Sequence, residues 1–218
     1  MLNVYCIPGM GVDGRLFKNL ELAHCNIHHI KWLTPLHNES MAGYAMRLSE
    51  QIDTSKPFAL AGVSFGGMNC VEIAKHLKPV RTFVISSCKR NSELPLKITF
   101  WRKFSLYKRL SDQHYIDGAM LLRGRFGVKG EEQSARFLEM LKTAPHNYFS
   151  GAVHCIMSWK NDEVPAGVVQ IHGTADHVLP IRRIRAHHVI KGGTHFMIVN
   201  RAKEISAIMD KELESFIS

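Results

Sequence analysis

The sequence predicts an α/β fold, with a parallel, doubly wound sheet of six strands covered by helices on both faces. Short apolar runs alternate with segments of helical periodicity, and most of these runs are apolar at nearly every position. The alternation stops once, over residues 92–160, and then resumes. Strands that alternate with helices imply right-handed crossovers and a parallel sheet. The late interruption predicts an insertion above that sheet.

The first part of the chain carries four of the six expected strands. Each is a short apolar run that ends at a turn signal or before a helical segment: 3–8, 27–33, 58–63 and 80–86. Three helices are expected between them, at segments where apolar residues recur at the spacing of one helical face: 13–22, 39–52 and 66–77.

The second part begins with the interruption and ends with the last two strands. Residues 92–160 combine helix-like segments, aromatic residues and many cations, with no convincing strand. Strands are expected again at 167–171 and 186–190, and a last helix at 202–216. The expected organisation is a core formed by residues 1–91 and 161–218, with residues 92–160 as a helical cap, or lid.

The composition is that of a soluble enzyme that needs no metal or disulfide. A chain of 218 residues with 45% apolar and 22% charged residues can bury a sizeable single core. The five cysteines are scattered and form no C-x-x-C pair, which argues for a reducing cytoplasm. Adjacent histidine pairs face opposite ways on a strand, so the 13 histidines predict no metal site. No cofactor is expected.

The N-terminal segment Met1–Tyr5 is expected to be a strand rather than a signal peptide, because it lacks a basic region and a long apolar run. No apolar run approaches the roughly 20 residues of a membrane span. These observations predict a cytoplasmic protein.

A candidate nucleophile lies between the third expected strand and the helix that follows it. Gly62-Val63-Ser64-Phe65-Gly66 fits the pattern G-x-S-x-G, and a strand–turn–helix setting makes that pattern a nucleophile elbow. Side chains at positions 62 and 66 would clash in such a tight turn, and Ser64 would adopt a strained backbone that exposes its Oγ. The alternative is a glycine-rich turn in which Ser64 only caps the helix.

A serine hydroxyl needs a base, and the base needs an acid to orient it. Asp176 ends the segment His172-Gly173-Thr174-Ala175-Asp176, which directly follows the strand at 167–171. His195 ends Gly192-Gly193-Thr194-His195, which directly follows the strand at 186–190. Both therefore lie at carboxyl ends of strands, where open parallel sheets bind ligands, and in the order serine, acid, base that accompanies a nucleophile elbow.

Other roles for these residues remain open at this point. Asp176 can be a turn residue and His195 a loop histidine. An acid placed after the strand at 80–86 is disfavoured, because no carboxylate occurs there before Glu93. His172 and His177 flank the acid and receive no role.

The glycine-rich turn Pro8-Gly9-Met10-Gly11 follows the first strand. Such a turn can direct a backbone N–H at the oxygen of a reacting carbonyl, and the second N–H would come from Phe65. We therefore expect Gly9, Met10, Gly11 and Phe65 around the substrate. The alternative is a simple turn from strand to helix.

Taken together, these motifs resemble the α/β-hydrolase superfamily. The turn PGMG, the elbow GVSFGG, the acid loop HGTADHVLP and the base loop GGTHF extend from residue 8 to residue 196. Small bacterial carboxylesterases with a helical cap, such as the pimeloyl-carrier-protein methyl ester esterases, are similar. The resemblance implies a serine hydrolase in which the N–H of Met10 binds the oxyanion.

The chain departs from that family in two respects. Pro8 stands where the family usually has histidine, which need not matter because the donors are backbone groups. The chain also starts at what resembles the family's third strand, so a minimal core without the N-terminal hairpin is expected.

The basic charge of the chain is concentrated near the start of the cap. Residues 89–129 hold ten cations and three anions, a net +7 out of a formal +9 for the whole chain. Trp101, Phe104 and Tyr107 share one helical face there, and either seal the cap onto the core or line an acyl pocket. Trp101 is expected at the substrate, with Met157 and Trp159 in the same roof.

The predicted function is hydrolysis of a carboxylic ester or thioester through an acyl-enzyme on Ser64. The expected partner is a small acyl substrate rather than a nucleic acid. The cationic cap favours a substrate attached to something acidic, such as coenzyme A or an acyl carrier protein, although basic residues can also serve solubility alone. The alternatives are a C–C bond hydrolase or lyase with the same triad, and a non-catalytic ligand sensor.

Overall fold

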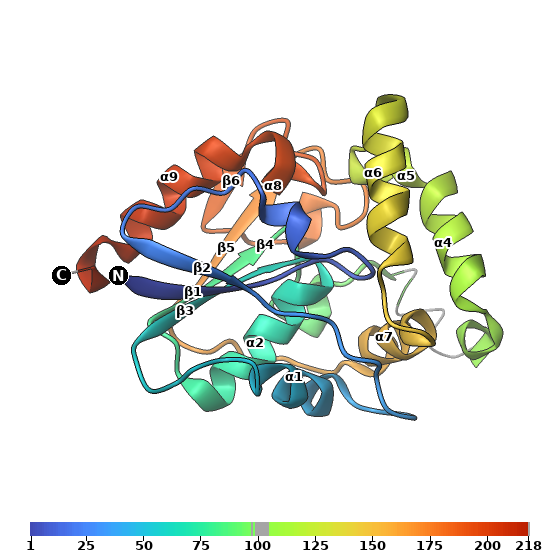
Figure 1. Cartoon of the computed structure of the whole chain (residues 1–218), viewed down its shortest axis with the longest axis horizontal. Helices are drawn as coiled ribbons and strands as arrows, with labels where there is room; N and C mark the ends of the chain where they lie inside the picture. The colour runs from blue at the N-terminus through green and yellow to red at the C-terminus, as the bar shows by residue number, and fades with distance from the viewer. Residues whose placement is uncertain (97, 99–104, 218) are drawn as a thin grey trace.

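The computed structural model describes residues 1–96, 98 and 105–217 (Figure 1). Within these residues six parallel strands form one sheet in the order β2-β1-β3-β4-β5-β6. The strands are β1 (Leu2–Ile7), β2 (Cys25–His29), β3 (Phe58–Val63), β4 (Arg81–Ile85), β5 (Val168–Gly173) and β6 (His188–Ile190). The expected six-stranded parallel α/β fold is confirmed.

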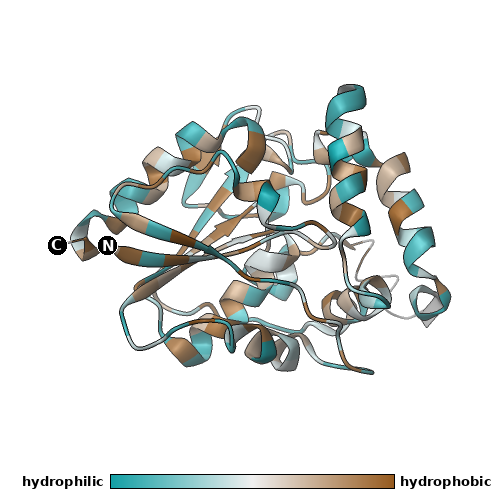
Figure 2. Ribbon diagram, viewed as in Figure 1, coloured by the Kyte–Doolittle hydropathy of each residue, from teal (hydrophilic) through white to brown (hydrophobic). Residues whose placement is uncertain are grey.

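Helices cover both faces of this sheet, which explains why its central strands are apolar throughout. In β3 and β5 every residue is buried, and Figure 2 shows the strands as predominantly hydrophobic. Helices α1 (Met41–Ser49) and α2 (Phe65–Leu77) lie on one face, and α9 (Ala202–Leu213) lies on the other (Figure 1). The arrangement is doubly wound.

Two of the predicted elements differ from the structure. The helix expected at 13–22 is only the 3-10 turn η1 (Gly14–Phe17). Asp13 caps its start by accepting the Arg15 N–H, and the backbone N–H groups that follow bond to carbonyls three residues back rather than four. The second strand was expected at 27–33 but ends at His29. Beyond it the chain leaves the sheet edge, and the Trp32 indole bonds to the turn after β1.

The described part of the segment between β4 and β5 consists of helices joined by turns and loops, with no strand. The helices of this segment are η2 (Asn91–Glu93), η3 (Ser105–Arg109), α4 (Asp112–Leu121), α5 (Arg123–Phe126), α6 (Gly130–Lys142) and α7 (Tyr148–Ser158). A further short helix, α8 (Met197–Asn200), follows β6 and the loop that carries His195. Figure 1 shows α4, α5, α6 and α7 together at one end of the sheet, away from both chain termini. The predicted helical face with Trp101 and Phe104 lies outside the described residues, and Tyr107 belongs to η3.

The strand order places a crevice at one definite point of the sheet. The chain runs from β1 outward to β2 and then returns to β3 on the other side of β1. In open α/β sheets ligands bind beyond the carboxyl ends of the strands where the winding direction reverses. That point lies between the turn after β1, which carries Gly9 and Met10, and the turn after β3, which carries Ser64.

None of the helices in the described part of the chain is both long enough and apolar enough to cross a membrane.

Candidate active site

Ser64 lies in the turn between β3 and α2 with a strained backbone, φ 54° and ψ −120°. Such a conformation costs about 1–3 kcal/mol and needs support from its surroundings. The Ser64 N–H donates to the Ile85 carbonyl (3.1 Å), and the Ser87 hydroxyl donates to the Ser64 carbonyl (2.5 Å). The end of β4 and the residues just after it therefore hold the turn in place.

The glycines of the elbow allow an approach that no side chain would permit. A Cβ at Gly62 would lie 2.4 Å from the Gly66 carbonyl oxygen, and a Cβ at Gly66 would lie 2.2 Å from the Ile7 carbonyl oxygen. β1, β3 and α2 meet at these two positions. The side chain of Ser64 makes no capping bond to α2, so the alternative in which it only caps the helix does not describe the structure.

The three residues predicted for catalysis are in hydrogen-bonding contact. His195 Nε2 is 3.0 Å from Ser64 Oγ, and His195 Nδ1 is 2.8 Å from Asp176 Oδ2. Asp176 is 3% exposed and His195 is 1% exposed, so their contact is buried, whereas the contact with the half-buried Ser64 is partly open to water. The structure thus brings Ser64 together with two residues that lie more than 100 positions further along the chain.

Asp176 is held as a carboxylate by its surroundings. Burial disfavours its charge, but His195 and the Leu179 N–H hold the pKa of Asp176 below its usual value. Its Oδ1 accepts the N–H groups of Val178 and Leu179, both at 2.8 Å, which leaves Oδ2 for His195. Asp176 is therefore also a turn residue, and the two roles use different oxygens.

His172, to which sequence reasoning gave no role, is buried beside the acid. Burial lowers the pKa of His172, so its imidazole is neutral at pH 7 and its Nε2–H donates to the Leu179 carbonyl (2.8 Å). Its Nε2 also lies 3.5 Å from Asp176 Oδ2, a contact of a neutral ring and not an ion pair. His172 thus fastens the acid loop to β5, while His177 is exposed.

The turn after β1 lies against the nucleophile. A Cβ at Gly9 would be 3.8 Å from the Ser64 Cβ, and Gly9, Met10 and Phe65 all line the cavity at the serine. Phe65 is the first residue of α2, so its N–H is one of those that a helix leaves without an intrahelical acceptor.

Trp32 supports this turn, and sequence reasoning did not identify it. Its indole N–H lies 2.8 Å from the Val12 carbonyl and 3.3 Å from the Gly9 carbonyl, and its ring stacks on Phe65 at 5.3 Å. One side chain therefore joins the two segments predicted to bind the oxyanion. In the sequence Trp32 belongs to the strand expected at 27–33, and that expectation assigned it no role at the site.

An apolar cavity of about 250 Å³ opens from Ser64 and His195 into the space under the cap. Its walls come from α2, the cap helices and the acid loop, and include Met68, Leu94, Tyr115, Phe137, Phe149 and Met157. Met157 therefore lines the roof of the cavity, as the sequence predicted.

Three residues predicted for this region lie elsewhere or cannot be placed. Gly11 is not among the described lining residues. It has φ +73°, and a Cβ there would lie 2.3 Å from the Phe149 ring. The buried Trp159 donates its indole N–H to Glu72 (2.6 Å), and Trp101 lies outside the described residues.

The cap touches the base loop directly, a contact that the sequence did not predict. The Phe196 N–H donates to the Phe126 carbonyl (3.0 Å), and the Phe126 ring stands edge-on to His195 at 5.6 Å. Gly127 follows with φ +88°, and a Cβ there would lie 2.2 Å from Thr194 Oγ1. These contacts join α5 to the loop of the candidate base.

No protein-family model and no curated protein sequence matches the chain. Among the described residues, no group of three or more His, Cys, Asp or Glu side chains could hold a metal ion.

Several solved structures share the fold at low sequence identity. A thermophilic esterase from Thermogutta terrifontis, solved with malate bound, has a TM-score of 0.72 at 13% identity, covering 100% of this chain and 91% of its own. YbtT, a type II thioesterase of the yersiniabactin NRPS/PKS pathway, has a TM-score of 0.68 at 16% identity (100% and 94% covered). ClbQ, of the colibactin NRPS/PKS pathway, has a TM-score of 0.67 at 16% identity (98% and 97% covered). With its parallel sheet, its strand–turn–helix at Ser64 and these neighbours, the chain has the α/β-hydrolase fold.

Proposed function

We propose that this protein is a serine hydrolase that cleaves carboxylic esters or thioesters through an acyl-enzyme on Ser64. The observation that carries the proposal is the pair of contacts Ser64 Oγ–His195 Nε2 (3.0 Å) and His195 Nδ1–Asp176 Oδ2 (2.8 Å) beside an apolar cavity. A nucleophile in contact with a base, and a base in contact with an orienting acid, are the parts that acyl transfer requires. That the neighbouring structures include an esterase and a thioesterase supports the choice of bond.

In the first half-reaction Ser64 Oγ attacks the carbonyl carbon while His195 Nε2 takes the hydroxyl proton. The carbonyl oxygen becomes an oxyanion, for which the N–H groups of Met10 and Phe65 are the proposed donors. The positive end of α2 adds to this stabilisation. The intermediate then expels the alcohol or thiol, which leaves with the proton from His195, and the acyl group stays on Ser64.

In the second half-reaction water replaces the leaving group. His195 takes a proton from the water as its oxygen attacks the acyl carbon, and the same two N–H groups receive the new oxyanion. The Ser64 Oγ–carbon bond then breaks, and Oγ takes the proton back from His195. The carboxylic acid is released, and the ionised Asp176 offsets the imidazolium charge in both halves of the cycle.

The cavity supports an apolar acyl group as the part of the substrate that enters. Its walls are aromatic and aliphatic, with Ser64 and His195 as polar groups at one end. For the leaving group, the net positive charge of residues 89–129 favours an acidic carrier.

Labelling with a fluorophosphonate tests the nucleophile before any substrate is known. Ser64 Oγ should form a bond to phosphorus with loss of fluoride, and intact-mass analysis should show one added group. Ser64→Ala should abolish the label and lower kcat on a reactive ester by about 10⁴–10⁶-fold. Ser55→Ala, at an exposed serine, is the control and should behave as wild type.

Full hydrolysis by Ser64→Ala would contradict the proposed mechanism. A labelled Ser64 with no hydrolysis of any ester or thioester would point instead to C–C bond cleavage by the same triad. A wild-type protein that takes no label at all would favour a ligand sensor.

A further inference from the structure

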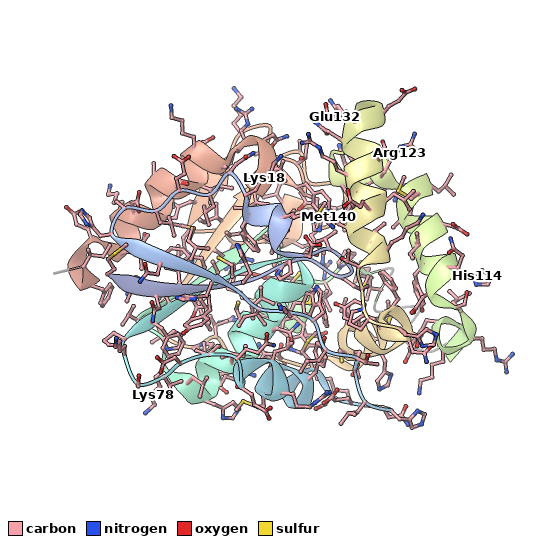
Figure 3. All side chains as sticks on the ribbon, viewed as in Figure 1. Lys18, Lys78, His114, Arg123, Glu132 and Met140 are labelled. Carbon is pink, nitrogen blue, oxygen red and sulfur yellow. The ribbon has the colours of Figure 1, made fainter. Side chains whose placement is uncertain are left out.

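A second cavity, of about 400 Å³, lies between cap helix α6 and the core. It is lined by α6, by the segment around η1, by the residues after α5, and by the end of α8. Its apolar floor is formed by Leu16, Val128, Phe137, Met140, Phe196 and Val199. Figure 3 labels two lining residues from its two sides, Lys18 of the core and Met140 of α6.

Two aromatic side chains line both this cavity and the one at Ser64: Phe137 and Phe196. Their rings meet edge to face at 5.3 Å, and Phe126 packs on each of them at 5.6 Å. The catalytic cavity and the second cavity are therefore neighbours, with these two rings between them.

Of the two residues, only Phe137 does not belong to the loop that carries His195. Phe196 follows His195, stacks on its imidazole at 6.0 Å, and is fixed by its N–H bond to Phe126. Phe137 projects from α6, and the second cavity offers space into which its ring can turn. Movement of Phe137 would join the two spaces without displacing the base.

The rim of the second cavity is polar, and three of the four charged side chains that line it are in ion pairs. Arg15 is bound by Asp13 (2.8 Å) and by Glu139 (2.5 Å), and Arg136 is bound by Glu132 (2.5 Å). The fourth, Lys18, is exposed to water at the rim, so the part of the lining that a ligand would shield from water is the apolar floor. An aliphatic chain matches that floor.

We propose that the second cavity is the distal half of the acyl site and that Phe137 is a movable partition, so that the substrates are long-chain aliphatic acyl esters or thioesters. The inference rests on the proposed function, because it needs an acyl group attached to Ser64. The head of the chain occupies the cavity at Ser64, and its tail passes Phe137 to reach Met140 and Val199. Each methylene moved from water to the floor is worth about a fourfold gain in kcat/KM.

A chain-length series from butyryl to palmitoyl thioesters tests the inference. In the wild type kcat/KM should keep rising into the long chains. Met140→Trp should fill the second cavity and reduce the palmitoyl-to-butyryl ratio by roughly 15- to 60-fold, because two or three methylenes return to water. Ala135→Trp places the same ring on an exposed position of α6, outside both lined cavities, and should leave that ratio unchanged.

Phe137→Ala supplies a change in the opposite direction, because it removes the partition and should raise the palmitoyl-to-butyryl ratio several-fold. A crystal structure with Ser64 phosphonylated by a p-nitrophenyl hexadecylphosphonate should show the alkyl chain between α6 and α8. A chain directed elsewhere, or an unchanged ratio in Met140→Trp, would overturn the inference while butyryl hydrolysis still upholds the proposed function. Absence of hydrolysis and of phosphonylation at every chain length would overturn the proposed function itself.

Discussion

Asp176 shows how one residue can serve both the local fold and the chemistry. Its Oδ1 closes a turn by accepting two N–H groups, and its Oδ2 faces the imidazole of His195. Since a carboxylate can only accept hydrogen bonds, His195 Nδ1 must carry the proton, and His195 Nε2 is left to accept the proton of Ser64. The acid therefore decides which imidazole nitrogen acts as the base.

Asp176→Asn should lower kcat by roughly 10⁴-fold while leaving the fold intact. The amide is of the same size, but an NH₂ group facing His195 Nδ1 would favour the wrong tautomer. Steady-state kinetics and circular dichroism measure the two effects. Asp162→Asn and Glu163→Gln change exposed acids near the end of the cap and should be silent. Activity that depended on Asp162 or Glu163 but survived Asp176→Asn would show that the acid has been assigned wrongly.

The pH profile should have a single acid limb. His195 must be neutral to accept the Ser64 proton, so kcat/KM should fall as the imidazole becomes protonated. Asp176 does not add a second limb, because its pKa lies below the usual value of about 3.9 and it stays ionised above that pH. We expect log kcat/KM measured from about pH 4.5 to 9 to reach a slope of one on the acid side. A flat profile with chemistry rate-limiting would contradict a histidine base.

The two ends of the cap meet in a buried polar cluster beside β5. The Lys89 ammonium donates to Glu93 (2.8 Å), to the Arg185 carbonyl (2.9 Å) and to the Gln170 side chain. Asn161, from the other end, donates to the Lys89 carbonyl (2.9 Å). Helices that enclose the cavity are thus fixed where they leave and rejoin the sheet.

Lys89→Met should destabilise the protein by about 3–5 kcal/mol, because it leaves the buried Glu93 carboxylate without its charge partner. Urea denaturation measures the change in the free energy of unfolding. Arg136→Met breaks the exposed i,i+4 pair with Glu132 and should cost less than about 1 kcal/mol. Equal effects of the two variants would mean that the cluster at Lys89 is not an essential part of the fold.

All six strands were expected, the four inner ones because a parallel sheet covered on both faces leaves a continuous apolar run in the sequence, as in Phe58–Val63. The prediction was least accurate at β2, an edge strand with three exposed residues, where that signal is weak. The segment expected as a helix at 13–22 forms a 3-10 turn with bonds three residues back, which apolar spacing alone does not distinguish from an α-helix.

The three catalytic candidates were accessible to sequence reasoning because each follows a strand within a short motif. The groups around them were not. Trp32, Phe126 and Phe196 act through contacts between segments far apart in the chain, and no local pattern marks such contacts. A spacing rule can place a residue at a strand end but cannot tell which cap side chain will lie over it.

The charge of the whole molecule is unevenly distributed, since most of the net +9 comes from residues 89–129. Lys108 and Arg109, at the end of η3, are exposed there. Charge concentrated near a site mouth raises the rate of encounter with anionic substrates, and salt screens this effect. The alternative is that these cations only keep an aromatic-rich cap soluble.

If the charge steers substrates, a coenzyme A or carrier-protein thioester should have a higher kcat/KM than a neutral ester of the same acyl group. That advantage should shrink between about 0.01 and 0.5 M salt, over which the Debye length falls several-fold. Lys108→Glu with Arg109→Glu should lower kcat/KM for the anionic substrate on the order of tenfold and spare the neutral one. Lys203→Glu with Lys211→Glu makes the same change in net charge on exposed positions of α9 and should have little effect. Equal salt dependence for anionic and neutral substrates would leave solubility as the role of these cations.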